Sequence, residues 1–387
     1  MASRSGEDIS PNDDQAQPQP HPYAFHVSGP RHLSSPNWRH LLNSTWKDGN
    51  YKRTVVACFI QAVYLLELDR QENRSEENAL APKWWLPFKY KLVQILIDER
   101  DRSIFGALLE WDRSAALADF ILMRPSGAPK AVLALRGTLL KSPTIRRDVE
   151  DDLRFLAWES LRGSVRYTIA LESLKSVAEK YRSGNVCIAG HSLGAGFALQ
   201  VGKALAKEGI YVDAHLFNPP SLSLAMSLRN IGDKAGDAWK KCRSMFASNN
   251  ETKAIGAAEE RNPVLGLNNW VSYFYGNKNS STGMQKWAPH LYVNNSDYIC
   301  CYYTDPAGSD NKDAGKEDPT PENGHVAAKL FVMSKGNQKF LEAHGLEQWW
   351  SNDLDPQLAL HNGKLISRQL RSLYHLPAPQ NPQRNPQ

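Results

Sequence analysis

The residues of this chain whose types and spacing best suit chemistry are Gly190-His191-Ser192-Leu193-Gly194. A short apolar run, residues 186–189, precedes them, and a stretch compatible with a helix, residues 195–208, follows. A serine at the tip of so sharp a strand-to-helix turn takes strained backbone angles, so both flanking positions need glycine to avoid steric clash. The N–H groups of the first helical turn then face any oxyanion that forms at the serine. The spacing therefore predicts that Ser192 is a nucleophile.

The context of this pentapeptide decides how it is interpreted. G-x-S-x-G alone is common and is compatible with a plain glycine turn. With a strand before it and a helix after it, the pattern is that of the nucleophile elbow of α/β-hydrolases. We therefore favour the catalytic interpretation of Ser192.

A nucleophilic serine also needs donors for the tetrahedral oxygen, since the loss of one donor costs about two to three orders of magnitude in rate. The backbone N–H of Leu193 supplies the first donor. The second is expected after an earlier parallel strand, and residues 131–138 form an apolar run that ends in Arg136-Gly137-Thr138. Gly137 lets the backbone approach closely, and Thr138 offers its N–H and its hydroxyl. Arg136 is expected to be structural, paired with a carboxylate.

The order of these motifs resembles that of the class 3 lipase family. The shared features are an apolar strand ending in R-G-T, a long helix, G-H-S-L-G-A-G, and a strand ending in F-N-P-P at residues 217–220. The family usually has F-R-G-T, G-H-S-L-G-G or G-H-S-L-G-A, and F-G-x-P at these places. The resemblance covers approximately residues 105–350. It implies an α/β-hydrolase fold and the hydrolysis of carboxylic esters, often acylglycerols or polar lipids. The chain lacks the H-G-G-G and G-D-S-L motifs of other esterase families.

The triad residues of such a fold are expected in the chain order Ser, Asp, His. Residues 291–300 predict a strand that ends in a polar turn containing Asp297. This segment is similar to the family's strand with N-x-x-D followed by apolar residues. Asp297 is therefore identified as the carboxylate that orients the histidine. Asp305 and Asp310, farther into the following loop, are the alternatives.

The general base is sought among the histidines that follow Asp297. His344, in F-L-E-A-H-G-L-E-Q-W-W, is similar to the H-x-L-E-x-Y-L block that carries the base in plant members of the family. His325 matches a separate block that opens a strand, and His361 lies in an expected helix. We assign His344 as base and later acid, with His325 and His361 as the alternatives. His191 is expected to pack beside the elbow strand.

Length and composition limit the class of protein. The 387 residues carry a formal charge of +5 and can bury a sizeable core. No long basic run is interleaved with aromatic residues, which argues against a nucleic-acid partner, and the apolar runs are far shorter than a membrane span. The N-terminal residues contain no secretory signal, and the odd number of cysteines, 5, favours a reduced, cytoplasmic setting. Metal ligands at useful spacing and cofactor fingerprints are not found, so no cofactor or metal is expected.

The alternation of strands and helices predicts an α/β-hydrolase fold, with a mostly parallel sheet covered by helices on both faces. The expected strands cover residues 105–111, 120–124, 130–135, 186–189, 210–217, 291–303 and 326–333, and the main helices cover 37–68, 153–181, 195–208 and 341–374. Polar, proline-rich residues 1–30 and 377–387 are expected to be disordered tails around a single domain, residues 31–376. Residues 221–290 are a partly helical insertion before the acid strand, longer than the family usually has.

The chain is therefore expected to be a serine lipase or esterase that acts on acyl esters of lipids through an acyl-enzyme. The residues 139–152, where the family carries a lid, are more charged than a lipid-facing lid, so a soluble or amphiphilic ester fits as well as bulk lipid. Contact with a membrane, if any, is expected to be peripheral. The alternative is a non-catalytic lipase-like interaction protein or a small-molecule sensor. The predicted triad and oxyanion donors are Ser192, Asp297, His344, Thr138 and Leu193.

Overall fold

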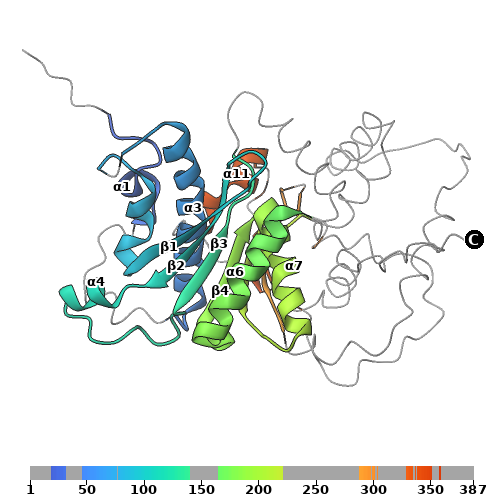
Figure 1. Ribbon diagram of the computed structural model, residues 1–387. Helices are drawn as coiled ribbons and strands as arrows, with labels where there is room; N and C mark the ends of the chain where they lie inside the picture. The colour runs from blue at the N-terminus through green and yellow to red at the C-terminus, as the bar shows by residue number, and fades with distance from the viewer. Residues whose placement is uncertain are drawn as a thin grey trace, which may run out of the picture.

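The central feature of the protein, in a computed structural model, is one twisted sheet (Figure 1). The structure describes residues 19–31, 46–75, 77–139, 164–220, 287–297, 299–300, 303, 328–333, 336, 338–350 and 357–358. Within these ranges the sheet has 8 strands, which lie side by side in chain order. They are β1 (Tyr90–Ile97), β2 (Ile104–Trp111), β3 (Ala131–Leu135), β4 (Val186–His191), β5 (Asp213–Phe217), β6 (His290–Asn294), β7 (Lys329–Met333) and β8 (Gln357–Leu358).

The five strands from β3 to β7 are parallel, and the strands at both edges are antiparallel to their neighbours. Every residue of β3 and β4 is buried. Their apolar sequences follow from burial on both faces, which removes the alternation of apolar and polar residues seen in half-exposed strands. The carboxyl ends of β3, β4, β5 and β6 consequently meet at one edge of the sheet.

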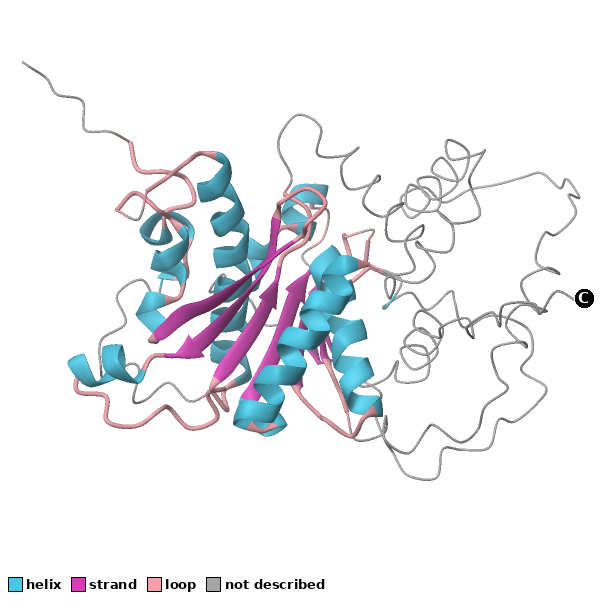
Figure 2. Cartoon of the chain, viewed as in Figure 1, coloured by secondary structure: helices cyan, strands magenta, loops and turns pink. Residues whose placement is uncertain are grey.

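Among the described residues, long helices cover both faces of this sheet (Figure 2). α6 (Val165–Tyr181) and α7 (Leu193–Lys207) pack on one face, and α3 (Gly49–Gln71) packs on the other. The shorter elements are α1 (Phe25–Ser28), α4 (Arg113–Ala118), α11 (Phe340–His344) and the 3₁₀ helices Ala81–Trp84, Leu86–Phe88, Ser183–Asn185 and Leu346–Trp350. No helix among the described residues is long and apolar enough to cross a membrane. This arrangement is that of an α/β-hydrolase, and the predicted fold class is confirmed.

The predicted strand at residues 120–124 is wrong, because the chain turns there. Phe120 has a φ of 60° and is 85% exposed, and Leu122 and Met123 are exposed as well. Only Ile121 is buried, against Ala116 of α4. A bulky residue at positive φ does not continue into a strand, and the apolar character of this segment gave no sign of that.

The expected boundaries at the two ends of the chain also differ from the structure. Residues 25–28, in the expected N-terminal tail, form α1, and Phe25 packs against Trp84 at a ring-centroid distance of 5.2 Å. Near the other end, Gln357 and Leu358 pair with β7 instead of continuing a helix. Pro356 disfavours a helical conformation for the residue before it, which is the signal for this break. The tails 1–18 and 377–387, residues 140–163 and residues 221–286 of the insertion lie outside the described residues.

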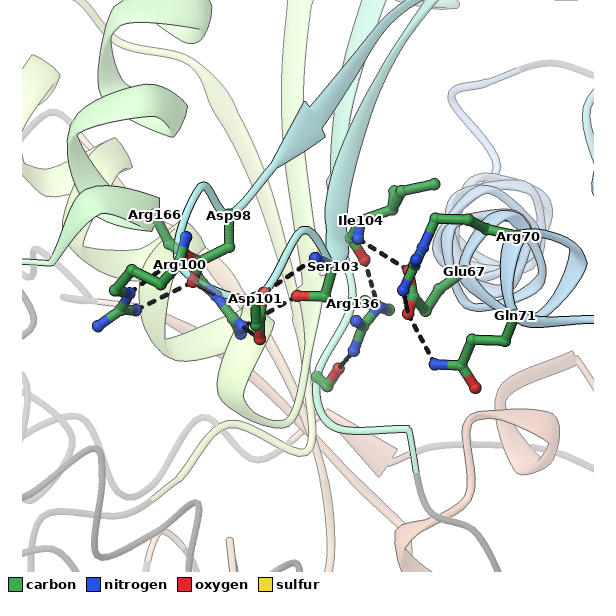
Figure 3. Close-up of polar contacts among 11 residues, drawn as sticks. Glu67, Arg70, Gln71, Asp98, Arg100, Asp101, Ser103, Ile104, Arg136 and Arg166 are labelled. Atoms are coloured by element: carbon green, nitrogen blue, oxygen red, sulfur yellow. Dashed lines mark hydrogen bonds and ion pairs between the residues drawn. The ribbon is translucent and has the colours of Figure 1, made fainter.

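Glu67 of α3 links this helix to β2 and to the R-G-T segment (Figure 3). One carboxylate oxygen accepts the N–H of Ile104 at 2.9 Å, and the Ile104 carbonyl accepts Nε of Arg136 at 2.5 Å. Arg70 and Gln71 donate to the other oxygen at 2.6 Å and 2.7 Å. Burial opposes ionisation of Glu67, but these hydrogen bonds outweigh it and lower its pKa to about 2. Arg136 is therefore structural, as expected, but among the described residues it donates to the backbone carbonyls of Ile104 and Gly137, and the expected ion pair with a carboxylate is not found.

The Glu67→Gln variant tests this link. The pKa of Glu67 in the folded protein, about 2, lies below the ordinary value of 4.5. The carboxylate therefore contributes stability above pH 4.5 that is lost as the pH falls toward 2. We expect the free energy of unfolding of the variant to be lower by about 2 kcal/mol at pH 7, as measured by urea denaturation. The difference from the native chain should shrink below pH 4.5. Glu172→Gln, on the exposed side of α6, is the control, and the same loss in both variants would contradict the role of Glu67.

Candidate active site

Ser192 lies on the turn between β4 and α7, with a φ of 53° and a ψ of −125°. These angles lie outside the helical and extended regions and are strained for any residue except glycine. The Ser192 N–H donates to the carbonyl of Phe217 at 2.9 Å, and its own carbonyl accepts the N–H of Ala195 at 2.9 Å. Hydrogen bonds to β5 and α7 therefore hold the strained turn that the sequence predicts.

The glycines on either side of Ser192 are required by close backbone contacts. A Cβ on Gly190 would overlap the backbone of Gly194. A Cβ on Gly194 would lie 2.5 Å from the carbonyl oxygen of Leu135 and 2.6 Å from that of Arg136. The first turn of α7 thus meets the end of β3 backbone to backbone, which confirms the steric reason for this spacing.

The R-G-T segment lies directly against the nucleophile turn. A Cβ on Gly137 would be 2.8 Å from Cβ of Ser192 and 2.9 Å from the carbonyl of His191. Thr138 is the next residue, and Leu193 opens α7. Among the described residues, the backbone N–H of Leu193 donates to no acceptor. The structure brings both predicted segments to Ser192, and the use of Thr138 and Leu193 as oxyanion donors stays a prediction.

Asp297, which follows β6, and His344, the last residue of α11, form a buried pair. Nδ1 of His344 lies 2.8 Å from Oδ2 of Asp297. The other carboxylate oxygen accepts the N–H of Ile299 at 3.0 Å, and the thiol of Cys300 lies 3.3 Å from Oδ2. The His344 ring is 4.9 Å from that of His191, the residue before Ser192. The two residues chosen from the sequence therefore contact each other next to the predicted nucleophile.

Asn218 is a site residue that the sequence analysis missed. It occupies the position of the glycine in the family's F-G-x-P pattern and has a φ of 47°. Its Nδ2 donates to Oδ2 of Asp297 at 2.7 Å and to the carbonyl of Ala343 at 3.1 Å, and its Oδ1 accepts Nε1 of Trp349 at 2.7 Å. Asparagine tolerates the left-handed conformation better than most residues. The F-N-P-P departure from the family pattern was the available signal, because it put a polar side chain next to the site.

A second residue that was missed, Tyr64 of α3, joins the two strand ends. Nε2 of His191 donates to the carbonyl of His344 at 2.8 Å, so its Nδ1 accepts from the hydroxyl of Tyr64, at 2.8 Å. The Tyr64 oxygen accepts the N–H of Gly137 at 2.9 Å. Burial, followed by the charge of a protonated His344, lowers the pKa of His191 to about 3. His191 is therefore a neutral structural residue, and a lone tyrosine in a distant helix gave no sequence signal.

Among the described residues, the Ser192 hydroxyl makes no hydrogen bond with an imidazole. Such bonds are often long in the absence of substrate and tighten only in the reacting complex. The alternative residues Asp305, Asp310, His325 and His361 lie outside the described residues.

A pair of Asn218 variants separates its two roles. Asn218→Gly keeps the left-handed backbone and removes the amide, whereas Asn218→Ala also adds backbone strain. We expect both to lower the free energy of unfolding by about 1–3 kcal/mol, because buried partners lose a hydrogen bond. Alanine should cost about 1 kcal/mol more than glycine. Thermal and urea unfolding measure both values, and a glycine variant as stable as the native chain would contradict the role of the amide.

Tyr64→Phe removes one hydroxyl and keeps the ring. We expect kcat for a short-chain acyl ester to fall about tenfold with KM little changed, because Gly137 and His191 lose a shared partner and the R-G-T segment shifts. Steady-state kinetics measure this, and a melting curve checks that the variant is folded. Tyr211→Phe, at a partly buried position near the start of β5, is the matched control. An unchanged kcat in Tyr64→Phe would show that the network does not position the site.

The sequence of the chain is similar to that of an Arabidopsis thaliana protein named GDSL esterase/lipase. The two are 28% identical over 353 residues, which are 85% of this chain and 95% of the relative. No protein-family model matches the chain. The elbow here reads Gly-His-Ser-Leu, and Gly-Asp-Ser-Leu occurs nowhere in the sequence. The comparison therefore identifies a relative that is named an esterase/lipase. It does not show that the chain belongs to the class 3 lipase family, which its motifs resemble.

Two solved esterase structures also resemble the chain. A hyperthermophilic esterase from the archaeon Pyrobaculum calidifontis is 13% identical, over 83% of this chain and 93% of that one, with a TM-score of 0.29. An arylesterase is 10% identical, over 83% of this chain and 98% of that one, with a TM-score of 0.30. At such low TM-scores these likenesses carry no argument, and the fold assignment rests on the strand order and direction described above.

Proposed function

We propose that this chain is a serine carboxylic-ester hydrolase that acts through an acyl-enzyme. The observation that carries the proposal is the strained Ser192, held on a strand-to-helix turn beside the buried Asp297–His344 pair. Three residue types with these roles, converging from the ends of β4, β6 and α11, are the constellation of serine hydrolases. The similarity to a relative named esterase/lipase supports the same reaction class.

The proposed proton path starts at the carboxylate. Asp297 accepts the Nδ1–H of His344, with the two atoms 2.8 Å apart, which leaves a lone pair on Nε2 of the imidazole. Nε2 takes the hydroxyl proton as Oγ of Ser192 attacks the acyl carbonyl. The tetrahedral intermediate then collapses, the C–O bond to the alcohol breaks, and the alcohol leaves with that proton. Water then attacks the carbonyl of the acyl-enzyme by the same steps, which releases the acid and restores the serine.

The backbone N–H of Leu193, with the N–H or hydroxyl of Thr138, would hold the negative oxygen of both intermediates. Leu193 is at the start of α7, where the positive end of the helix dipole adds to the stabilisation. Gly137 allows the approach of Thr138 to this point, because a side chain there would overlap Ser192. The two backbone N–H groups lie just after β3 and at the start of α7, so they need little reorganisation during the reaction.

For the finer identity we propose an enzyme of the class 3 lipase type that takes acyl esters of amphiphilic lipids. The R-G-T strand end, G-H-S-L-G-A-G and F-N-P-P support this type. The charged sequence at residues 139–152, with Lys141, Arg146 and Arg147, favours a polar or amphiphilic ester over bulk fat. A panel of acyl esters of increasing chain length and head-group polarity tests the substrate class.

The test of the reaction is a fluorophosphonate probe, which labels an activated serine covalently. We expect the folded chain to be labelled and Ser192→Ala not to be. His344→Ala and Asp297→Asn should lose ester hydrolysis by several orders of magnitude, on the scale of triad removals. His325→Ala and His361→Ala serve as matched controls and should keep activity.

Two results would overturn these assignments. A folded native chain with neither labelling nor hydrolysis would favour a non-catalytic lipase-like protein. The native chain could instead be labelled, with activity lost in His325→Ala or His361→Ala and kept in His344→Ala. That result would support the reaction class and would show that His325 or His361, not His344, is the general base.

A further inference from the structure

A second polar cluster lies at the opposite end of the parallel strands from Ser192. Cys187 is near the start of β4, and Asp213 and His215 are in β5. One ligand atom from each of these three side chains lies within 4.8 Å of the other two. Cys187 pairs with Asp213 across the two strands, and His215 pairs with His290 of β6. A thiol, a carboxylate and two imidazoles therefore occupy adjacent positions on one face of the sheet.

Both imidazoles present a ring nitrogen without a hydrogen-bond partner to the same carboxylate. Nε2 of His215 and Nδ1 of His290 are buried atoms that have none. They lie 3.4 Å and 3.6 Å from the two oxygens of Asp213. The two rings are stacked, with their centroids 4.6 Å apart and an interplanar angle of 5°. The His215 side chain is only 2% exposed, so the long contact with Asp213 offsets only part of the cost of burying this nitrogen.

The spacing of these atoms fits ligands around a metal better than hydrogen bonds. Distances of 3.4 Å and 3.6 Å are long for hydrogen bonds between nitrogen and oxygen. Zinc bonds of about 2.0–2.3 Å put the ligand atoms of a tetrahedral site about 3.5 Å apart. Cys187 and His290 have farther to move, because only the ligand atoms of Cys187, Asp213 and His215 lie within 4.8 Å of one another. The partial exposure of Asp213 and His290, 34% and 18% for the side chains, provides an entry path for an ion.

The neighbours of the cluster are placed as outer partners of metal ligands. The other nitrogen of His215, Nδ1, is 2.9 Å from the hydroxyl of Tyr292. A ligating histidine usually donates its second N–H to such a partner, which fixes the tautomer and the ring. Nζ of Lys52, from α3, donates to Oδ2 of Asp213 at 2.7 Å. Ligating carboxylates are commonly hydrogen-bonded in this way.

We propose that Cys187, Asp213, His215 and His290 form a zinc site. One thiolate, one carboxylate and two imidazoles are ligands that Zn²⁺ accepts in tetrahedral geometry, and a full set of four protein ligands is that of a structural site. Binding displaces the thiol proton of Cys187 to solvent. The ion joins β4, β5 and β6 and, through Lys52, α3. It takes no part in ester hydrolysis, because the cluster and Ser192 lie at opposite ends of the strands.

The ion used to test this site is Co²⁺, which replaces Zn²⁺ and shows a thiolate-to-metal absorption band. We expect the chelator-treated full-length chain to bind one equivalent of Co²⁺ with this band, to melt at a higher temperature, and to lose the band when Zn²⁺ is added. Cys187→Ser should abolish the band. The matched control, Cys58→Ser, changes a buried thiol of α3 outside the cluster and should leave it intact.

A conservative variant tests the outer partner and keeps the proposal testable if Cys187→Ser does not fold. Tyr292→Phe should weaken Co²⁺ binding by about 10–100-fold, as the loss of outer partners does elsewhere. Absence of the thiolate band in the folded native chain would overturn the proposal. So would a band that survives in folded Cys187→Ser, or equal affinities in the native chain and Tyr292→Phe.

Discussion

The backbone contact between the end of β3 and the first turn of α7 is the constraint on which the candidate active site depends. Gly194 lies so close to the carbonyls of Leu135 and Arg136 that no side chain fits between them. The contact forces Ser192 into strained angles and places Gly137 against it. Strain of this kind costs about 1–3 kcal/mol and persists only where the surroundings over-determine it. The buried, parallel pairing of β4 with β3 and β5 supplies those surroundings.

The apolar core holds the strands, but buried polar contacts orient the groups that would react. Asn218 satisfies Asp297, the carbonyl of Ala343 and the indole of Trp349 at once. Tyr64 does the same for Gly137 and His191. In a low-dielectric interior an unpaired polar group is costly, so each partner restricts the others to one arrangement. The hydrogen bonds that run from α3 through the ends of β3 and β4 to α11 therefore form one network.

Sequence reasoning succeeded for features that a short, continuous segment of the chain determines. The elbow is set by two glycines around Ser192, and the blocks around Asp297 and His344 identified two residues that the structure brings into contact. It failed for features that depend on contacts between helices and strands far apart in the chain. Tyr64 contacts residues far along the chain, and no local pattern marks it. Asn218 was visible only as a departure from F-G-x-P, and the positive φ of Phe120 was hidden by the apolar character of its segment.

The helix α3 connects the two polar clusters of the sheet. Lys52, near its start, contacts Asp213 at the amino end of β5, whereas Tyr64 contacts His191 at the carboxyl end of β4. The 12 positions between these residues span about 18 Å of helix, and the 4 positions from Cys187 to His191 span about 13 Å of strand. The helix therefore runs in the same direction as the strands and is held near its start by Lys52 and farther along by Tyr64. A contact that fixes Lys52 thus limits how far Tyr64 can slide from Gly137, because a helix transmits axial displacement along its whole length.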